Sequence, residues 1–214
     1  MNLALFGGTF DPVHCGHLCA ARAAQEAFTL GRIEFIPAAR PPHKLDRPIT
    51  PFAHRYAMVS LACAGIPEFV PSLLEGPEEG DGKANYSIDT VRQVRATLAP
   101  SDRLYFLIGA DAFLDLPHWR EGTALLEACD FILVSRPGFP IAEIARVVPA
   151  ELRAGAEGMN RIPLRRSTLH LLPTVESDVS SSGIREAVTA GKSLAGLVPD
   201  AVAEYIREQG LYRS

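Results

Sequence analysis

Residues 7–17 of this chain read Gly7-Gly-Thr-Phe-Asp-Pro-Val-His-Cys-Gly-His17. The short apolar run Asn2–Phe6 precedes them, and the Ala-rich stretch Leu18–Phe28, closed by Gly31, follows. This order predicts a strand, a glycine turn and a helix. Because Arg32–Ile36 is again apolar, we expect a βαβ unit whose two strands lie parallel and adjacent, with a right-handed crossover.

The alternation of apolar runs and helical stretches continues along the chain. The further expected strands are Phe69–Leu74, Arg103–Ile108, Asp130–Ser135 and Thr168–Leu172. The further expected helices are Phe52–Ala64, Ser87–Leu98, Ile141–Val148, Glu151–Ala156, Ser182–Ala190 and Asp200–Gln209. Ser87 suits an N-cap, and Gly210 suits the C′ position of the last helix. The pattern predicts an α/β fold with a doubly wound, Rossmann-like parallel sheet flanked by helices.

Composition narrows the class of protein. The 214 residues carry 21 Lys and Arg against 25 Asp and Glu, a net charge of −4, and 47% of them are hydrophobic. This charge argues against a nucleic-acid or anionic-membrane binder, but a small anionic substrate stays open. We expect one domain over residues 1–214. With four unpaired cysteines, no signal peptide and no apolar run of membrane-spanning length, a cytoplasmic location is expected.

Ligands of open parallel sheets bind beyond the carboxyl ends of the strands, near the point where strand order reverses. The stretches that follow the expected strands are 7–17, 37–44, 109–119, 136–138 and 180–185. Their histidines, glycines, serines and cations suit a phosphate-rich ligand that also carries rings. Glycines at 7 and 8 allow the backbone close to a phosphate, and His14 and His17, three residues apart, can face one anion.

Each of these signals also has an ordinary structural reading. An isolated HxxH pair is most often unrelated histidines, and a metal site would need further ligands that we cannot place. The Walker A and GxGxxG patterns are absent. Trp119 alone is more often a core residue, and Asp111 can cap a helix. His54, His118 and His170 are expected to be structural or exposed.

Taken together, residues 7–17 resemble the signature of the nucleotidylyltransferase superfamily, whose core (H/T)xGH reads His14-Cys-Gly-His17 here. Further motifs resemble those of the bacterial nicotinate-nucleotide adenylyltransferases. They are Pro41-Pro-His-Lys44, Asn85-Tyr-Ser-Ile-Asp-Thr90, Gly109-Ala-Asp111, Leu116-Pro-His-Trp119, Ser135-Arg-Pro-Gly138 and Ser180-Ser-Ser-Gly-Ile-Arg185. The chain departs from the family at Ser87 and Ser182, where Thr is common, so the hydroxyl is kept and a methyl group is lost.

The resemblance implies a nucleotidylyltransferase fold and adenylyl transfer from ATP to nicotinate mononucleotide, which gives nicotinate adenine dinucleotide and pyrophosphate in NAD biosynthesis. It implies that Mg²⁺ rides on the ATP phosphates, with no metal ligand from the protein. The C-terminal helical segment, about 180–214, would complete the active site. Whether the chain assembles with copies of itself stays open.

The resemblance also assigns residues to roles. Those implied in catalysis are His14, His17, Lys44 and Arg185. Those implied in ATP binding are Gly7, Gly8, Thr9, Phe10, Gly109, Asp111, Ser180 and Ser181, with the backbone of 8–10 also meeting the mononucleotide phosphate. Those implied in nicotinate mononucleotide binding are Tyr86, Ser87, Trp119 and Arg136.

Two rival functions remain open. A relative with another acceptor, such as a phosphopantetheine adenylyltransferase or a cytidylyltransferase, would lack the combination of Trp119 with Tyr86 and Ser87. A non-catalytic nucleotide sensor would bind ATP without releasing pyrophosphate. The residues do not decide between nicotinate and nicotinamide mononucleotide, because backbone donors leave no side-chain signal.

Overall fold

One sheet organises the molecule. The computed structural model describes residues 1–41, 48–77, 84–135, 138–156, 158–173 and 179–213. Among these residues, the sheet has seven strands in the order β3-β2-β1-β4-β5-β7-β6, and every neighbouring pair is parallel except β6 with β7. The strands are β1 (Asn2–Gly8), β2 (Arg32–Pro37), β3 (Phe69–Pro71), β4 (Arg103–Gly109), β5 (Asp130–Ser135), β6 (Arg161–Pro163) and β7 (Thr168–Pro173). The expected doubly wound α/β sheet is confirmed.

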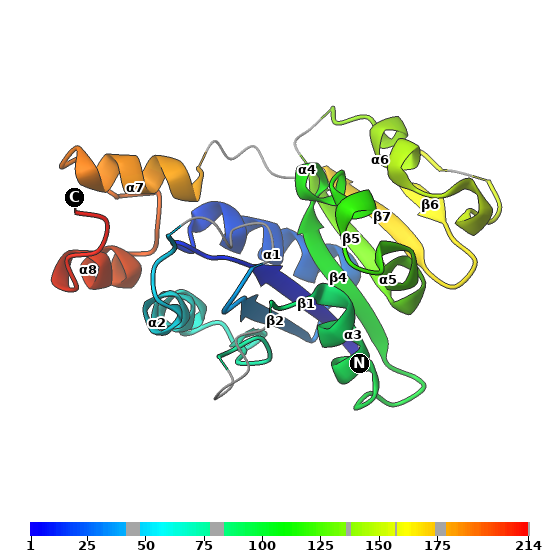
Figure 1. The fold of residues 1–214 in the computed structure, drawn as a ribbon, viewed down its shortest axis with the longest axis horizontal. Helices are drawn as coiled ribbons and strands as arrows, with labels where there is room; N and C mark the ends of the chain where they lie inside the picture. The colour runs from blue at the N-terminus through cyan, green and yellow to red at the C-terminus, as the bar shows by residue number, and fades with distance from the viewer. Residues whose placement is uncertain (42–47, 78–83, 136–137, 157, 174–178, 214) are drawn as a thin grey trace.

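The helices follow the strands much as the apolar pattern predicts. They are α1 (Cys15–Phe28), α2 (Phe52–Cys63), α3 (Ser87–Arg95), α4 (Ala110–Phe113), α5 (Gly122–Ala128), α6 (Ile141–Val147), α7 (Ser181–Thr189) and α8 (Asp200–Glu208). Two short 3-10 helices are η2 (Leu116–His118) and η3 (Ala150–Leu152). Figure 1 shows α7 and α8 at one end of the molecule and α6 with β6 at the other. No helix among the described residues is long and apolar enough to cross a membrane.

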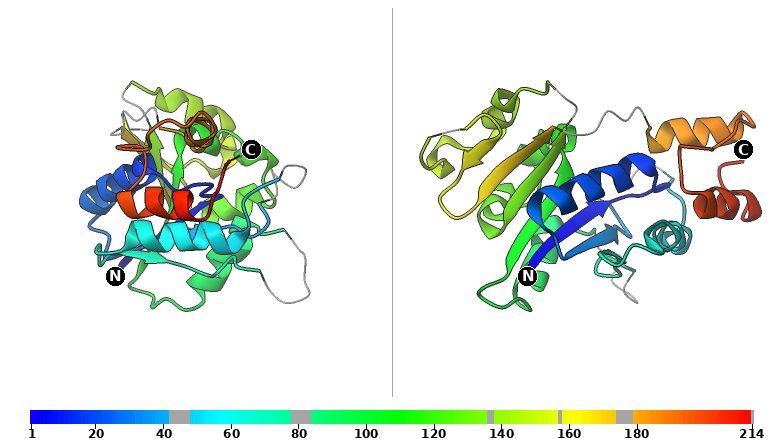
Figure 2. Two further views of the ribbon diagram at one scale, coloured as in Figure 1. Left: turned by 90° about the vertical axis from the view of Figure 1, so that its left-hand side faces the viewer. Right: turned by 180° about the vertical axis from the view of Figure 1, so that it is seen from behind.

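Successive residues of a strand point to opposite faces of the sheet, and helices cover both faces, so side chains on both faces are buried. In β1, Leu3 and Leu5 belong to one apolar cluster and Ala4 and Phe6 to the other. The first cluster includes residues of α3, α5 and α6, and the second includes residues of α1, α2 and α8. Figure 2, seen from behind, shows α1 lying along the sheet on the second face. Continuous apolar runs therefore mark strands that are covered twice.

Strand order reverses beside β1. From β1 the chain proceeds outward to β2 and β3, whereas β4 pairs with the opposite edge of β1 and leads outward to β5 and β7. The helices that follow β1 and β4 consequently pack on opposite faces. Right-handed crossovers in opposite directions require this arrangement. A crevice at the carboxyl ends of β1 and β4 is the expected result.

Several sequence-based boundaries were wrong in detail. Tyr86, not Ser87, is the N-cap of α3, and Ser87 is its first helical residue. Residues 151–156 form only the end of a one-turn 3-10 helix rather than an α-helix. The sequence patterns gave no sign of β6, because Ile162 is its only fully buried residue. The His14-Cys-Gly-His17 motif enters the helix earlier than expected, since α1 begins at Cys15.

The close approach of Gly122 to the turn at Leu116 yields a stability prediction. A Cβ atom at Gly122 would lie 2.6 Å from the carbonyl oxygen of Leu116, and Gly122 N–H donates to Trp119 O at 3.1 Å. We expect Gly122→Ala to lower the free energy of unfolding by about 1–3 kcal/mol, the usual cost of overpacking. Denaturant unfolding measures it.

The control is Gly109→Ala. Its Cβ would meet no heavy atom within 4 Å, and its φ of −66° suits alanine. The free energy of unfolding of this variant should stay within about 0.5 kcal/mol of the parent. Equal losses in the two variants would contradict the steric explanation.

Candidate active site

Two adjoining pockets open at the carboxyl ends of β1 and β4. Their volumes are about 550 and 560 Å³, and both are lined by Gly7, Ile108 and Ala112. They therefore meet where strand order reverses, as the topology predicts. The first pocket lies toward α1 and β5, and the second lies toward α3 and η2. Two separate ligands can thus be held side by side.

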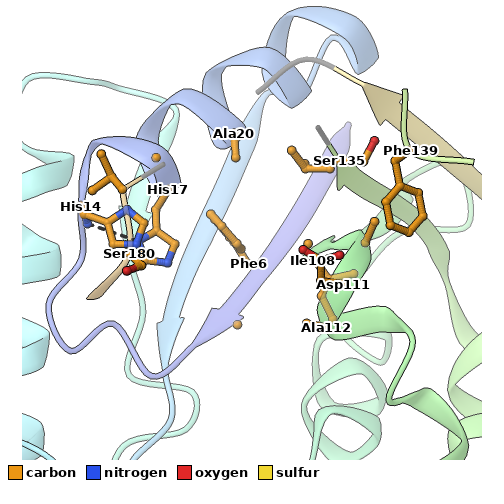
Figure 3. Close-up of a pocket in the computed structure, with 16 residues that line it drawn as sticks. Phe6, His14, His17, Ala20, Ile108, Asp111, Ala112, Ser135, Phe139 and Ser180 are labelled. Atoms are coloured by element: carbon orange, nitrogen blue, oxygen red, sulfur yellow. Dashed lines mark hydrogen bonds between the residues drawn. The ribbon is translucent and has the colours of Figure 1, made fainter. Parts of the chain in front are cut away.

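The first pocket contains six of the residues that the sequence analysis selected. They are Gly7, His14, His17, Gly109, Asp111 and Ser180. Figure 3 shows His14, His17 and Ser180 on one side, with Ile108, Asp111 and Ala112 across from them. Imidazole and hydroxyl groups thus face a carboxylate across the space. This donor and acceptor set suits a ligand with phosphates at one end and ribose hydroxyls at the other.

The two histidines are held against each other. Their ring centroids are 3.7 Å apart, and the backbone N–H of His14 donates to His17 Nδ1 at 3.2 Å (Figure 3). Since Nδ1 of His17 accepts, the proton of its neutral imidazole resides on Nε2. His17 is further packed edge-on against Phe10, with ring centroids 5.0 Å apart. The tautomer and the orientation of His17 are therefore both set before any ligand binds.

Burial keeps both imidazoles neutral. It lowers the pKa of His14 to about 4, and it lowers the pKa of His17 well below its usual range, with a further decrease from the neighbouring His14. Two buried side-chain atoms at this pocket, His14 Nδ1 and Ser135 Oγ, have no hydrogen-bond partner within the described part of the chain. Buried polar atoms normally have partners, so these two are available to a ligand.

The second pocket is the more aromatic one. Tyr86, Ser87 and Trp119 line it together with Gly8 and Thr9. The Trp119 ring packs edge-on against Phe106, with centroids 6.3 Å apart, which fixes its position. Since α3 begins at Ser87 and Tyr86 contributes no side-chain cap, the positive end of this helix faces the pocket. A flat ring that carries a negative group fits these surroundings.

Sequence reasoning assigned no role to four charged or ionisable residues of the second pocket: Glu75, Asp115, His118 and Arg120. Thr90 Oγ1 donates to the buried carboxylate of Glu75 at 2.6 Å, and burial raises the pKa of Glu75 although this bond opposes the increase. The Arg120 guanidinium lies 4.6 Å from the centroid of the Tyr86 ring. His118 and Arg120 flank Trp119 in the sequence, and that adjacency was the only available signal.

The loop between β1 and α1, Thr9–His14, separates the two pockets. Phe10 adopts a left-handed backbone conformation with a φ of 49° and turns its ring into the core, where it is 2% exposed. A Cβ at Gly8 would lie 3.0 Å from this ring, so the second glycine is needed for a close approach. Phe10 lines neither pocket. Any ligand contact of Phe10 therefore has to come from its backbone.

A buried arginine that the sequence analysis overlooked supports this loop. Arg55 of α2 has no exposed surface and donates to the carbonyl oxygens of Thr9 at 2.7 Å, Thr50 at 2.8 Å and Ala39 at 3.4 Å. Burial lowers the pKa of Arg55, and the charge of Asp11 opposes that change. No motif signals this residue, because carbonyl acceptors leave no trace in a sequence.

Two predicted residues of the C-terminal segment, Ser181 and Arg185, bond to the loop and line neither pocket. Ser181 Oγ donates to Pro12 O at 2.9 Å, and Arg185 Nη1 donates to Asp11 O at 2.7 Å. Of the serines in that motif, only Ser180 lines the first pocket. Lys44 and Arg136, also predicted for the site, lie outside the described residues.

Comparison with known proteins places the chain in a family. Residues 5–187 match the family model described as cytidylyltransferase-like. A protein of Solibacter usitatus named "Probable nicotinate-nucleotide adenylyltransferase" is 45% identical, and the match covers 99% of this chain and all of the relative. A protein of the same name from Thermus thermophilus is 41% identical over the full length of both.

Solved structures agree on the fold. The nicotinic acid mononucleotide adenylyltransferase of Plasmodium falciparum, solved in complex with APC, superposes with a TM-score of 0.73 at 20% identity, covering 99% of this chain and 96% of that one. The same enzyme in complex with NaAD gives a TM-score of 0.72. With the full-length matches at more than 40% identity, these findings show that the chain belongs to the nicotinate-nucleotide adenylyltransferase family, within the cytidylyltransferase-like group.

Proposed function

We propose that this protein transfers the adenylyl group of ATP to nicotinate mononucleotide, producing nicotinate adenine dinucleotide and pyrophosphate for NAD synthesis. The observation that carries the proposal is the pair of adjoining pockets, which share Gly7, Ile108 and Ala112, with the two histidines lining the first of them. A reaction between two phosphorylated nucleotides needs two such pockets in contact. The names of the full-length relatives support the same reaction.

ATP would occupy the first pocket. The Nε2–H of His17 is the donor that the tautomer inferred from the hydrogen bond between His14 and His17 leaves for a phosphate oxygen, and His14 lies against it. Asp111, across the pocket, would accept from the ribose hydroxyls of the adenosine (Figure 3). The backbone at Gly7 and Gly109 would lie against the nucleotide. In this proposal Lys44, Ser181 and Arg185 act on the β- and γ-phosphates, and the segment 180–214 completes the site.

Nicotinate mononucleotide would occupy the second pocket. Trp119 would stack on the pyridine ring, while the N–H groups of Tyr86 and Ser87 meet its carboxylate at the positive end of α3. The backbone of Gly8, Thr9 and Phe10 would meet the phosphate. Arg136 is proposed on this side as well. The cation of Arg120, beside Tyr86, adds favourable charge for a carboxylate.

Mg²⁺ would arrive bound to the ATP phosphates. Asp111 is the one carboxylate among the described residues that line the first pocket, and a lone carboxylate suits an ion that keeps water and phosphate oxygens as its main ligands. When bound, the ion neutralises charge on the triphosphate. The cytoplasm as the place of the reaction, and any assembly of identical chains, stay predictions from the sequence.

The chemistry requires alignment more than proton transfer. A phosphate oxygen of the mononucleotide attacks the α-phosphorus of ATP, the new P–O bond forms, and the bond to the β-phosphate oxygen breaks to release pyrophosphate. The attacking oxygen is already anionic, so no general base is needed. The protein has to hold two polyanions in line and place donors where negative charge accumulates. His14 and His17, fixed before binding, are placed for that task.

The direct test is turnover of the purified protein. Incubation with Mg-ATP and nicotinate mononucleotide should yield equal amounts of pyrophosphate and dinucleotide. Folded protein without turnover would refute the function, and ATP binding without pyrophosphate release would favour a sensor. Parallel reactions with CTP, phosphopantetheine and nicotinamide mononucleotide distinguish the related transferases and fix the pyridine preference.

His17 provides the first prediction from this mechanism. We expect His17→Ala to lower kcat by about a hundredfold, because one preorganised donor to the transition state is lost. The control is His54→Ala, which removes an imidazole bonded to Tyr205 and outside both pockets. Near-normal turnover of His17→Ala under saturating substrate would contradict the assigned role.

The buried imidazoles provide a second prediction. Because the pKa of His14 is lowered from 6.5 to about 4, the unfolded chain binds more protons than the folded one in that range, and stability falls as pH drops from 6.5 to 4. A bound triphosphate favours the charged imidazole, so it should raise the pKa of His14 and His17. Denaturant unfolding at pH 6.5 and at lower pH measures the loss of stability, and imidazole NMR titrations of the free protein and of its complex with a non-hydrolysable Mg-ATP analogue measure the pKa values. A His14 midpoint near 6.5 in the free protein, or no upward change with the analogue, would contradict it.

A further inference from the structure

The C-terminal segment, about residues 180–214, forms several hydrogen bonds with the loop Thr9–His14, which borders both pockets. Besides the bonds from Ser181 and Arg185, Tyr212 O–H donates to Asp11 Oδ1 at 2.7 Å, and Cys15 N–H at the start of α1 donates to Leu197 O at 2.9 Å. Figure 1 shows the chain returning through α7 and α8 to this side of the molecule. The loop Thr9–His14 and the first residue of α1 are therefore held by residues far along the chain.

Asp11 is the central group of these contacts. It is only 6% exposed, and its two carboxylate oxygens have different partners: Oδ1 accepts from Tyr212, and Oδ2 accepts from Thr50 N–H at 3.2 Å. A buried carboxylate that loses a hydrogen-bond donor destabilises the folded protein, so the position of Asp11 is set by the groups that donate to it. Arg55 of α2 bonds to the same loop, at Thr9 O. The loop is thus fixed between α2 and the C-terminal segment.

Tyr212 is itself firmly placed. Thr189 Oγ1 of α7 donates to Tyr212 O at 3.1 Å, and Leu211 N–H donates to Ile206 O of α8 at 3.0 Å. Burial and the adjacent Asp11 raise the pKa of the Tyr212 phenol, so the hydroxyl stays a donor at neutral pH. Tyr212 lines neither pocket. Any influence of this residue on the reaction therefore passes through its neighbours, of which Asp11 belongs to the loop and accepts the hydrogen bond from the phenol.

We propose that Tyr212 is a positioning residue for adenylyl transfer, which holds Asp11 and thereby fixes the loop on which the two nucleotide pockets border. At one end of this loop Thr9 lines the second pocket, and at the other end His14 lines the first. The inference rests on the proposed function. When the hydroxyl is removed, each pocket keeps its own walls, but the two phosphates lose their relative alignment, to which in-line displacement is most sensitive.

The experiment compares Tyr212→Phe with Tyr205→Phe. Tyr205 also belongs to the C-terminal segment and is half-buried, and its hydroxyl hydrogen bond goes to His54 Nδ1 of α2 at 2.9 Å rather than to Asp11. We expect Tyr212→Phe to lower kcat by about tenfold or more while KM for each substrate changes by less than about threefold. Tyr205→Phe should keep kcat within about twofold of the wild type, although its Tm should change by about as much as that of Tyr212→Phe.

Wild-type turnover, measured first, decides the proposed function separately. If the wild type is active, a Tyr212→Phe kcat within about twofold of it, or an equal decrease in Tyr205→Phe, overturns the inference. A loss that appears only in KM also overturns it, because pocket walls rather than alignment would then be affected. Should Tyr212→Phe fail to fold by circular dichroism, Tyr212→Leu serves instead, because it also removes the hydroxyl donor to Asp11, and kcat should again fall with KM preserved. Thr50→Gly cannot replace it, because Thr50 bonds to Asp11 through its backbone.

Discussion

The position of β1 between β2 and β4 is the constraint on which the rest of the molecule depends. Its two neighbours belong to halves of the chain that wind in opposite directions, so the helices after β1 and β4 pack on opposite faces. These helices diverge above the junction of the two strands. The two pockets meet there at Gly7 and Ile108, in the last part of each strand. The location of the chemistry thus follows from handedness before any functional side chain is considered.

Much of this arrangement could be predicted from the sequence, because strands covered on both faces leave continuous apolar runs such as Arg103–Ile108. β6 escaped prediction since it pairs through three residues at the sheet edge and buries mainly Ile162. At the site, Gly7, His14, His17, Asp111 and Trp119 were predicted and line the two pockets. Their motifs are short and local, so the resemblance to a known family could be recognised from the sequence.

The supporting residues could not be predicted for a physical reason. Arg55 bonds to carbonyl oxygens as far as 46 residues away, and Tyr212 bonds to an Asp that is 201 residues away. Backbone acceptors are present at every position, so they leave no compositional mark, and long-range pairs leave no periodicity. His118 is exposed, as expected, and also lines the second pocket beside Trp119. The partners of Arg55 and Tyr212 can be identified only from the folded structure.

The bond between Asp11 and Tyr212 has a consequence for the order of folding. Asp11 lies near the beginning of the chain, and its donor lies beyond α8, the last helix of the described residues. Contacts between residues so far apart in the sequence carry a large loop-closure entropy, so they form late in folding. A partly synthesised chain could therefore complete β1, α1 and both histidines while the loop between the pockets is still unanchored. Assembly of the pockets and their alignment become two successive events, and the turn that follows α8 decides the second.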